Sequence, residues 1–294
     1  MQTNLATRAM LAELSISQWS ARRLDRKVTD EVHSNHGAAA DAGRYNKALL
    51  SKDALAAIQK AANAARQKHY ELTLPWNDAG ARILSARAFM RYTDEMRPLR
   101  EAFAAAVEAF LANYDAYKED ARRRLSGMFS EDDYPTADQI ARRFGFDFNV
   151  WPMPDAQDFR ADLTADQVDA IRADIERRTR EQIGRAVNDA WQRVAERVGA
   201  MVERLSAYKP ASASPTGKAE GQFRDSLVTN IRELVDTLPA LNVTDDPKLA
   251  EIAQRMKDEL CRFEPQDLRD FGDYRDQTLE SARDILASVN EYLA

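Results

Sequence analysis

The sequence contains a single cysteine, Cys261, and few glycines and prolines, ten of each in 294 residues. One cysteine excludes a disulfide within the chain and also a cysteine-rich zinc site. The scarcity of glycine and proline, with 31% charged and 44% hydrophobic residues, is typical of long helices rather than of sheets. We therefore predict an all-α protein in which Cys261 is a buried structural thiol near a helix end.

Long apolar runs are also missing. No stretch approaches 18 consecutive apolar residues, so the sequence predicts no membrane span. The opening residues, MQTNLATRAMLAELS, lack the apolar core of a signal peptide. We therefore expect a cytoplasmic protein with no membrane partner.

Charge is unevenly distributed along the chain. The formal net charge of -6 argues against a general coat for nucleic acid. Residues 1–70 nevertheless carry eleven Lys and Arg against six Asp and Glu, so the remaining residues carry -11. Such an asymmetry indicates a partner surface, unless each part simply has solvated faces.

Two long segments, 78–128 and 164–208, carry apolar residues at spacings of three and four. This heptad pattern predicts an antiparallel coiled-coil hairpin, although the same stripes are compatible with pairing between chains and hence with self-association. Pro98 predicts a kink or a helix start in the first segment. A capping box at Thr164 predicts the start of the second.

The connection between these segments, residues 129–163, is expected to form a compact tip. Thr136 is a predicted helix cap, and the alternation in 144–151 predicts a short strand, the only one in the chain. The aromatic residues of the segment form either a small local core or an exposed binding tip. The candidate tip contacts are Tyr134, Phe146, Phe148 and Trp151.

The remaining segments are expected to form bundles of shorter helices. Helices are predicted over 4–28 and 51–70, and over 222–238, 247–262 and 273–293, with a turn at 265–271. The composition of KPASASPTGKAEG predicts a linker. The predicted organisation is a basic N-terminal region (1–77), the hairpin (78–208), the linker (209–221) and a C-terminal bundle (222–294).

Candidate binding residues concentrate in the basic N-terminal region. Near Tyr45, its cations resemble a phosphate-binding patch with an aromatic side chain for stacking, and the alternative is a solvated face around a core tyrosine. The candidate contacts are Arg22, Arg23, Arg26, Lys27, Arg44 and Lys47. The run Arg122–Arg124 lies close to the acidic SEDD segment, which favours ion pairs within the chain.

Catalytic signatures are missing. There is no glycine-rich phosphate loop, nucleophile elbow, HExxH motif or dinucleotide fingerprint. His33 and His36, with Asp30 and Glu31 nearby, could hold a metal ion, but no third ligand is identifiable. We therefore expect no enzymatic activity, no metal and no cofactor.

Three stretches resemble a family of bacterial and phage proteins known as domain of unknown function 3150. They are ISQWSARRLDRKVTDEV (16–32), GRYNKALLSKDALAAI (43–58) and YPTADQIARRFGFDFNVWPMP (134–154). The family occurs in phages and integrative elements, often beside MoxR-like AAA+ ATPases and recombination genes. The resemblance implies an accessory role in mobile-element assembly or DNA processing, in a bacterial cell or a phage-infected host. Matching of the opening motif adds Trp19 to Arg22 and Arg23 as candidate contacts.

Two functions remain open at this point. The first is a phage or mobile-element protein that acts as an oligomeric interaction scaffold. The second is a nucleic-acid-binding accessory factor that works with a MoxR-like AAA+ ATPase in recombination or DNA processing.

Overall fold

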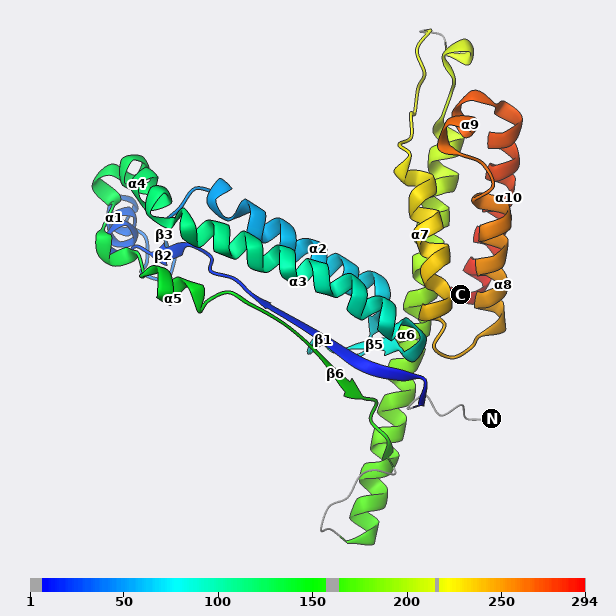
Figure 1. The fold of residues 1–294 in the computed structure, drawn as a ribbon, viewed down its shortest axis with the longest axis horizontal. Coiled ribbons are helices and arrows are strands. Elements are labelled where there is room, and N and C mark those ends of the chain that lie inside the picture. Colours follow the sequence, from blue (N-terminus) through cyan, green and yellow to red (C-terminus); the bar gives the residue numbers. More distant parts are fainter. Residues whose placement is uncertain (1–6, 157–163, 215–216, 294) are drawn as a thin grey trace. The chain divides into compact units, whose positions relative to one another are not determined.

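The computed structural model describes residues 7–156, 164–214 and 217–293. The chain divides into two compact units. Unit 1 consists of Met1–Glu13, Tyr70–Tyr92 and Asn149–Ala294, and unit 2 consists of Leu14–His69 and Thr93–Phe148. The chain passes between the units four times, each time within a regular element (Figure 1). These elements are β1 (Ala9–Ser17), α2 (Ala56–Leu72), α3 (Phe89–Ala112) and β6 (Gly145–Pro152).

The prediction of an all-α protein is wrong. The chain is 67% helical, but it also contains a four-stranded antiparallel sheet and a two-stranded sheet. The larger sheet has the order β4-β5-β1-β6, in which Ala9 of β1 lies opposite Ser85 of β5. The further strands are β4 (Leu74–Pro75), β5 (Arg82–Ser85), β2 (Arg22–Leu24) and β3 (Asn46–Ala48). The fold class is therefore mixed α/β.

Strand β1 lies where a helix was expected. From Glu13 to Ser17 its residues alternate between polar and apolar, with Leu14 and Ile16 as the apolar members. This period of two favours a strand, because alternate side chains then point to the same face of a sheet. Composition averaged over the whole chain conceals such a short local pattern. Strand β6, by contrast, confirms the strand predicted over 144–151, although it is not the only one.

Unit 1 is built around the second half of a long helix, α6. Its core is one apolar cluster to which β4, β5 and the first residues of β1 also contribute. The helix predicted over 164–208 is confirmed as α6 (Ala165–Ala207). The three predicted C-terminal helices correspond to α7 (Ser226–Leu241), to α8 (Pro247–Arg255) with the π-helical turn η8 (Met256–Leu260), and to α10 (Gly272–Leu293). The short helix α9 (Pro265–Asp270) lies where a turn was predicted.

The predicted coiled-coil hairpin of residues 78–208 is also wrong. Helix α6 packs mainly against α10 and α7 within unit 1, and Trp191 of α6 stacks on Tyr292 of α10 with ring centroids 4.5 Å apart. Helix α3 belongs to unit 2 from Thr93 onward. The stripe of α3 and the second half of the stripe of α6 are therefore covered by different partners. Where the linker was expected, Lys209 and Glu220 form an antiparallel bridge.

Unit 2 contains α2 up to His69, α3 from Thr93, and the shorter helices α1 (Arg26–His36), α4 (Tyr114–Leu125) and α5 (Ala137–Ala141). Figure 1 shows α2 and α3 side by side, and Lys68 of α2 pairs with Glu95 of α3 at 3.0 Å. Helix α3 continues through Pro98, so the expected helix start is not found there. Short 3-10 turns within the described residues include η2 (Asp53–Leu55), η3 (Ala86–Ala88), η4 (Ser126–Met128), η5 (Glu131–Asp133) and η7 (Ala211–Ala213).

Aromatic side chains form much of the interior of unit 2. Trp19 is buried, and its ring lies 6.3 Å from that of Phe110 and 6.2 Å from that of Tyr114. Farther along α3, the rings of Phe103 and Phe146 are 5.7 Å apart. The stripe that suggested a coiled-coil seam on α3 therefore packs against residues of β6 and of the segment before β2.

Both predicted helix caps are confirmed. Thr136 begins α5 with a capping box, in which its hydroxyl accepts from the N–H of Gln139 at 3.3 Å. Thr164 begins α6, and its N–H donates to Oε1 of Gln167 at 3.2 Å. Each cap gives partners to backbone groups that a helix end would otherwise leave unsatisfied.

Candidate binding site in unit 2

Helix α1 follows β2 and precedes β3 in the chain, and it begins with two basic residues, Arg26 and Lys27. Its N-cap is Asp25, whose carboxylate accepts from the N–H of Val28 at 3.2 Å. The helix ends at Gly37, which has the left-handed conformation (φ 59°) that glycine adopts without steric cost. Strands β2 and β3 pair so that Arg23 lies opposite Lys47.

Lys47 is buried at the centre of this region, with 5% of its surface exposed. Its Nζ lies 2.6 Å from Asp133 and 3.2 Å from Asp25, and it donates to the carbonyl of Met128 at 2.8 Å. A buried ammonium group requires such partners, because leaving it unpaired would cost several kcal/mol, of order 3–5. Lys47 therefore ties together β3, the cap of α1 and the segment 128–133.

Lys47 and its carboxylate partners shift one another's pKa values. Burial lowers the pKa of Lys47, but its hydrogen bonds to Asp133 and Asp25 outweigh burial, so the pKa lies above its ordinary value. The hydrogen bond from the backbone N–H of Val28, supported by Lys47, holds the pKa of Asp25 below its ordinary value. The lysine is therefore held as a cation beside two carboxylates.

Arg23 is the second cation that belongs to this centre. Its guanidinium donates to the carbonyl of Asp132 at 2.7 Å and lies 3.2 Å from the carboxylate of Asp133. Asp133 consequently serves both Arg23 and Lys47. Of the seven candidate contacts in the basic region, Trp19 and Lys47 are buried. The guanidinium of Arg23 is bound to the segment 128–133 through Asp132 and Asp133.

A hollow of about 860 Å³ adjoins this centre. It is lined by β2, by the first turn of α1 and by residues of the segment 127–133. Arg26 and Lys27 lie on its wall, and Glu31 is an acidic residue that also lines it. In the part of the chain that the structure describes, no ion pair involves Arg26 or Lys27, whereas both aspartates in the lining pair with Lys47.

The position of Arg26 and Lys27 on the helix is electrostatically unfavourable. They are the first two residues of α1, whose first turn contains no acidic residue. The helix dipole places partial positive charge at this end, so cations are favoured at the opposite one. The carboxylate of the N-cap Asp25 already accepts from the N–H of Val28 and is paired with Lys47. An anion held at the hollow would therefore act on the side chains of Arg26 and Lys27, whose repulsion it would relieve.

Two residues beside the hollow have strained backbones. Ala21, just before β2, has φ 48°, and Ser126, just before the segment 127–133, has φ 47°. Residues other than glycine seldom adopt positive φ, and such strain is found preferentially at functional sites. Both residues lie at the points where the chain enters the elements that line the hollow.

The remaining candidate contacts of the basic region, Arg22 and Arg44, do not line this hollow. Arg22 is exposed, and Arg44 lines a separate hollow of about 340 Å³ with Tyr45, His33 and His36. Within the described residues, no group of three or more His, Cys, Asp or Glu is arranged to hold a metal ion. The two histidines therefore lie side by side at a surface, next to a tyrosine that is 40% exposed.

The acidic loop after α4 is fixed by ion pairs, as the sequence predicted for Arg122. Glu131 lies 2.9 Å from Arg122 and 2.7 Å from Lys118. Arg124 instead donates to the carbonyl of Ala48 at 2.8 Å, and Arg123 pairs with Asp120 at 3.3 Å. Of the three arginines, Arg122 therefore holds the loop, Arg124 joins α4 to β3, and Arg123 pairs within α4.

The predicted tip residues do not share one environment. Tyr134 donates its hydroxyl to the carbonyl of Leu49 at 2.8 Å, Phe146 is buried, and Phe148 is half-buried. Trp151 is 54% exposed. Three of the four therefore contribute to packing, and only Trp151 keeps the exposure that a binding tip requires.

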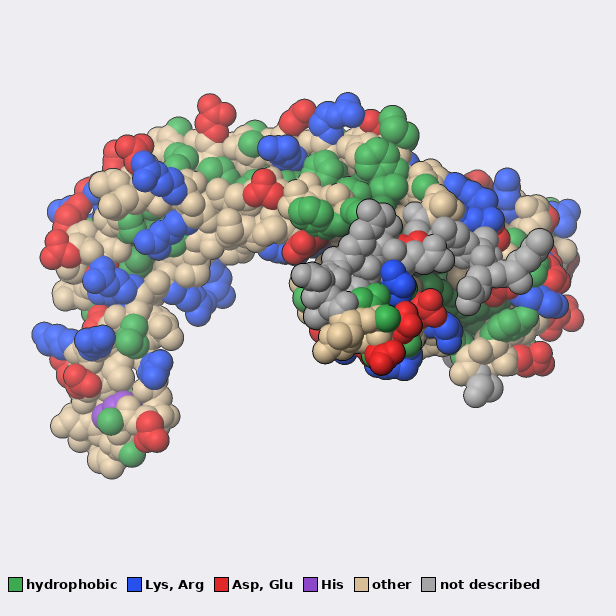
Figure 2. All heavy atoms as spheres, turned by 90° about the horizontal axis from the view of Figure 1, so that it is seen from below, with side chains coloured by type: hydrophobic (Ala, Val, Ile, Leu, Met, Phe, Trp, Pro, Cys, Tyr) green, Lys and Arg blue, Asp and Glu red, His purple; other side chains and the backbone are tan. Residues whose placement is uncertain are grey.

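Figure 2 shows how charge is spread over one face of the molecule. Lys and Arg side chains alternate with Asp and Glu rather than forming one continuous basic surface. Unit 2 as a whole has 18 Lys and Arg against 17 Asp and Glu. Any attraction for an anion is therefore local to the hollow.

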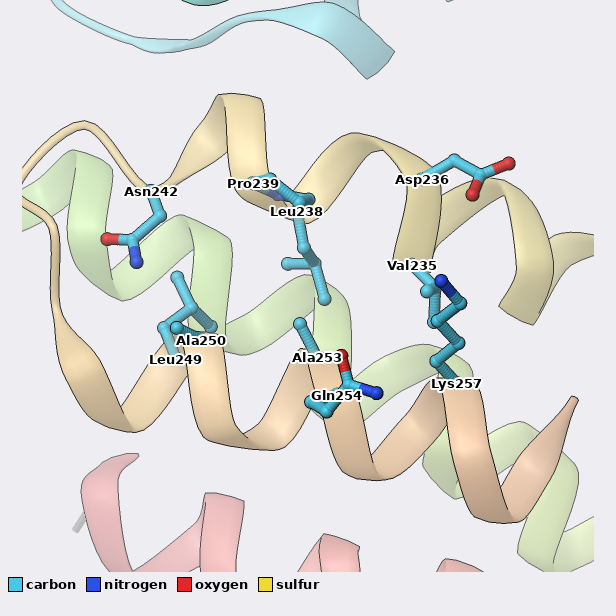
Figure 3. A pocket seen from close by; sticks show the side chains of 10 residues that line it. All are labelled: Val235, Asp236, Leu238, Pro239, Asn242, Leu249, Ala250, Ala253, Gln254 and Lys257. Atoms are coloured by element: carbon cyan, nitrogen blue, oxygen red, sulfur yellow. The ribbon is translucent and has the colours of Figure 1, made fainter.

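Unit 1 has a hollow of its own, of about 290 Å³, between α7 and α8 (Figure 3). Its sides are apolar, and Asp236 and Lys257 lie at one end. Asn242 at the other end bonds to the backbone of Asp246, with both bonds at 2.8 Å. The charged groups therefore lie at the margin of this hollow and do not converge on a reacting atom.

Sequence reasoning missed the acidic partners that organise the candidate site. Asp25 and Asp133 were not singled out, although an Asp immediately before a helix is a typical N-cap. The partnership of Lys47 with Asp133, 86 positions away in the chain, has no local signal.

No family model matches the chain, and no curated protein or solved structure matches it either. Within the described residues, no helix is both long enough and apolar enough to cross a membrane.

Proposed function

We propose that this protein is a non-enzymatic interaction scaffold that self-associates and binds the phosphate backbone of DNA at the hollow of unit 2. The observation that carries the DNA-binding part is the position of Arg26 and Lys27. They lie on the wall of a hollow of about 860 Å³, at the positive end of α1, without ion pairs among the described residues. Cations in such a position attract phosphate.

The state of Lys47 supports binding rather than catalysis. A lysine that acts as a nucleophile or a base needs a lowered pKa, so that the neutral amine is available. The pKa of Lys47 is raised, and its ammonium group is engaged by Asp25, Asp133 and a backbone carbonyl. The group at the centre of the site is therefore a structural cation.

The aromatic residue in the lining supports contact with the backbone rather than with bases. The ring of Phe129 is stacked on Tyr134, with centroids 5.0 Å apart, and the guanidinium of Arg122 lies 4.8 Å from its centroid. A ring with these internal partners offers little surface for a stacked base. Contacts to phosphate position a protein without reading sequence, so we expect binding with little sequence preference.

The proposed setting is the cytoplasm of a bacterial cell or of a phage-infected host. It follows from the resemblance to domain of unknown function 3150, and the single cysteine is compatible with a reducing compartment. The same resemblance makes a MoxR-like AAA+ ATPase a proposed protein partner. No residue of the chain is assigned to that contact.

The test is the salt dependence of DNA binding in two matched charge-reversal variants. R26E/K27E removes the two cations of the hollow, whereas K52E/K60E makes the same change in charge at two other exposed lysines of unit 2. Glutamate in the first turn of a helix interacts favourably with the dipole, so R26E/K27E should not destabilise α1. Fluorescence anisotropy with a labelled duplex and a labelled single strand measures both variants.

We expect the wild-type protein to bind DNA with an affinity that falls steeply as salt is raised. R26E/K27E should bind at least about tenfold more weakly, with a log–log salt slope smaller by about two, because each lost phosphate contact lowers the slope by about one. K52E/K60E should retain the wild-type slope. The DNA-binding part of the proposal is wrong if the wild type does not bind at low salt, or if both variants bind equally well.

A further inference from the structure

The two halves of α6 differ in how far they are covered. All buried residues of this helix lie from Ala186 onward. In the first half, Val168, Ile171 and Ile175 belong neither to the core of unit 1 nor to the partly buried residues that pack against it. Figure 1 shows this half running past the ends of α7 and α10. Among the apolar residues of this stripe between 165 and 185, Ile183 packs against the described core, whereas Val168, Ile171 and Ile175 do not.

The charge of this first half changes sign along the helix. Residues 165–176 carry a net charge of -3, and residues 177–185 carry a net charge of +3. The acidic part contains Asp166, Asp169, Asp174 and Glu176, with Arg172 as the exception. The basic part contains Arg177, Arg178, Arg180 and Arg185, with Glu181 as the exception. A helix of this kind is complementary to a reversed copy of itself.

We propose that residues 165–185 pair antiparallel with the same segment of a second copy of this chain. Antiparallel pairing sets the acidic part of each helix against the basic part of the other and brings the two apolar stripes together. A parallel arrangement would place like charges side by side. The contact is isologous, so it closes as a dimer and does not extend into a fibre.

The charge pattern also predicts the register. The change of sign falls close to Ile175, so the two-fold axis passes near this residue and Ile175 faces its counterpart. At 1.5 Å per residue the paired segment is about 30 Å long. With Ile175 on the axis, Val168 of one copy lies opposite Gln182 of the other, and both side chains are half-buried.

Ion pairs within the helix do not remove this complementarity. Arg177 pairs with Asp174 and Glu181, and Arg178 pairs with Asp174 at 2.7 Å. These side chains are 40% or more exposed, and exposed pairs of this kind contribute little to stability. They keep the single helix intact and can exchange partners when a second copy approaches.

This inference deepens the self-associating part of the proposed function and rests on it. Its test compares I171Q/I175Q, which removes the middle of the stripe, with A170Q/A173Q. The control makes two neutral changes to glutamine at exposed positions of the same helical segment, about 160° away from the stripe at 100° per residue. Analytical ultracentrifugation over roughly 1 to 100 μM, where interfaces of moderate strength dissociate, measures the mass.

We expect the wild type and A170Q/A173Q to form dimers that weaken as salt is raised, and I171Q/I175Q to remain monomeric. Circular dichroism should show that all three proteins unfold at nearly the same temperature, because the stripe lies outside the core. A wild type that is monomeric at every concentration overturns the inference, as does an I171Q/I175Q variant that still dimerises.

The orientation is tested separately by disulfide cross-linking in a C261S background. V168C alone should not cross-link, whereas an equimolar mixture of V168C and Q182C should. Cross-linking by V168C alone, as expected of a parallel dimer, or a mixture that does not cross-link, overturns the inference. Because these residues lie outside the hollow of unit 2, the DNA affinity of I171Q/I175Q shows independently whether the DNA-binding part of the proposed function holds.

Discussion

The two units bury their residues in different ways. Unit 1 has one contiguous apolar cluster formed by α6, α7, α8, α10 and nearby strands. Unit 2 relies on an aromatic interior around Trp19 and on a buried lysine held by two aspartates. The comparison shows that charge has two uses in unit 2. Lys47 supports the structure, whereas Arg26 and Lys27 remain available at the adjoining hollow.

The largest expected loss of stability is that caused by Trp19→Ala in unit 2. Trp19 is 5% exposed and contacts both Phe110 and Tyr114. Removing a buried tryptophan costs about 3–5 kcal/mol, through lost burial and the cavity that remains. Hydrogen exchange followed by mass spectrometry should show lost protection in α1, α3 and α4. A loss below about 1 kcal/mol would mean that unit 2 does not depend on its aromatic interior.

The next largest loss of stability is expected for Lys47→Met, which keeps much of the side-chain volume but removes the charge. It leaves Asp25 and Asp133 without their shared cation, and breaking a buried pair in this way costs about 3 kcal/mol. Lys52→Met at an exposed position should change the free energy of unfolding by about 0.5 kcal/mol or less. Urea titration measures both. Equal effects would show that Lys47 is an ordinary surface lysine.

The stability of unit 2 should also depend on pH through Asp25 and Lys47. The pKa of Asp25 lies below its ordinary value of 3.8, so its stabilisation is present above about pH 4 and is lost as the pH falls further. The pKa of Lys47 lies above 10.5, so its stabilisation is present below that pH and is lost as the pH rises through the folded-state value. The urea midpoint of the wild type should fall more at alkaline pH than that of K47M, and an identical profile would contradict the account.

The smallest effect is that of Thr136→Ala. The hydroxyl of Thr136 caps α5, a helix of five residues that is too short to be stable by itself. Losing this cap costs about 1 kcal/mol. Exchange should accelerate at the amides of α5 and of the adjoining start of β6 but not in unit 1. Unchanged exchange in α5 would show that tertiary packing alone holds it.

Predictions from local signals were mostly confirmed, although the helix predicted over 4–28 was wrong because β1 is a strand. Predictions that depend on distant partners were less reliable. The caps at Thr136 and Thr164, the strand near residue 148 and the C-terminal helices follow from neighbours in the chain. The hairpin prediction failed because a heptad stripe shows that a face is buried but not what covers it. For the same reason, the candidate site was recognised by its cations, while the role of Lys47 depends on Asp133, which only the fold brings close.

The two proposed binding surfaces belong to different units and should be separable. Sedimentation of the protein with a labelled DNA duplex, read by both protein and label absorbance, tests this most directly. The account predicts DNA-bound dimers for the wild type, DNA-bound monomers for I171Q/I175Q, and dimers without DNA for R26E/K27E. It is contradicted if the wild type sediments as a DNA-free monomer, or if either variant loses both properties while remaining folded.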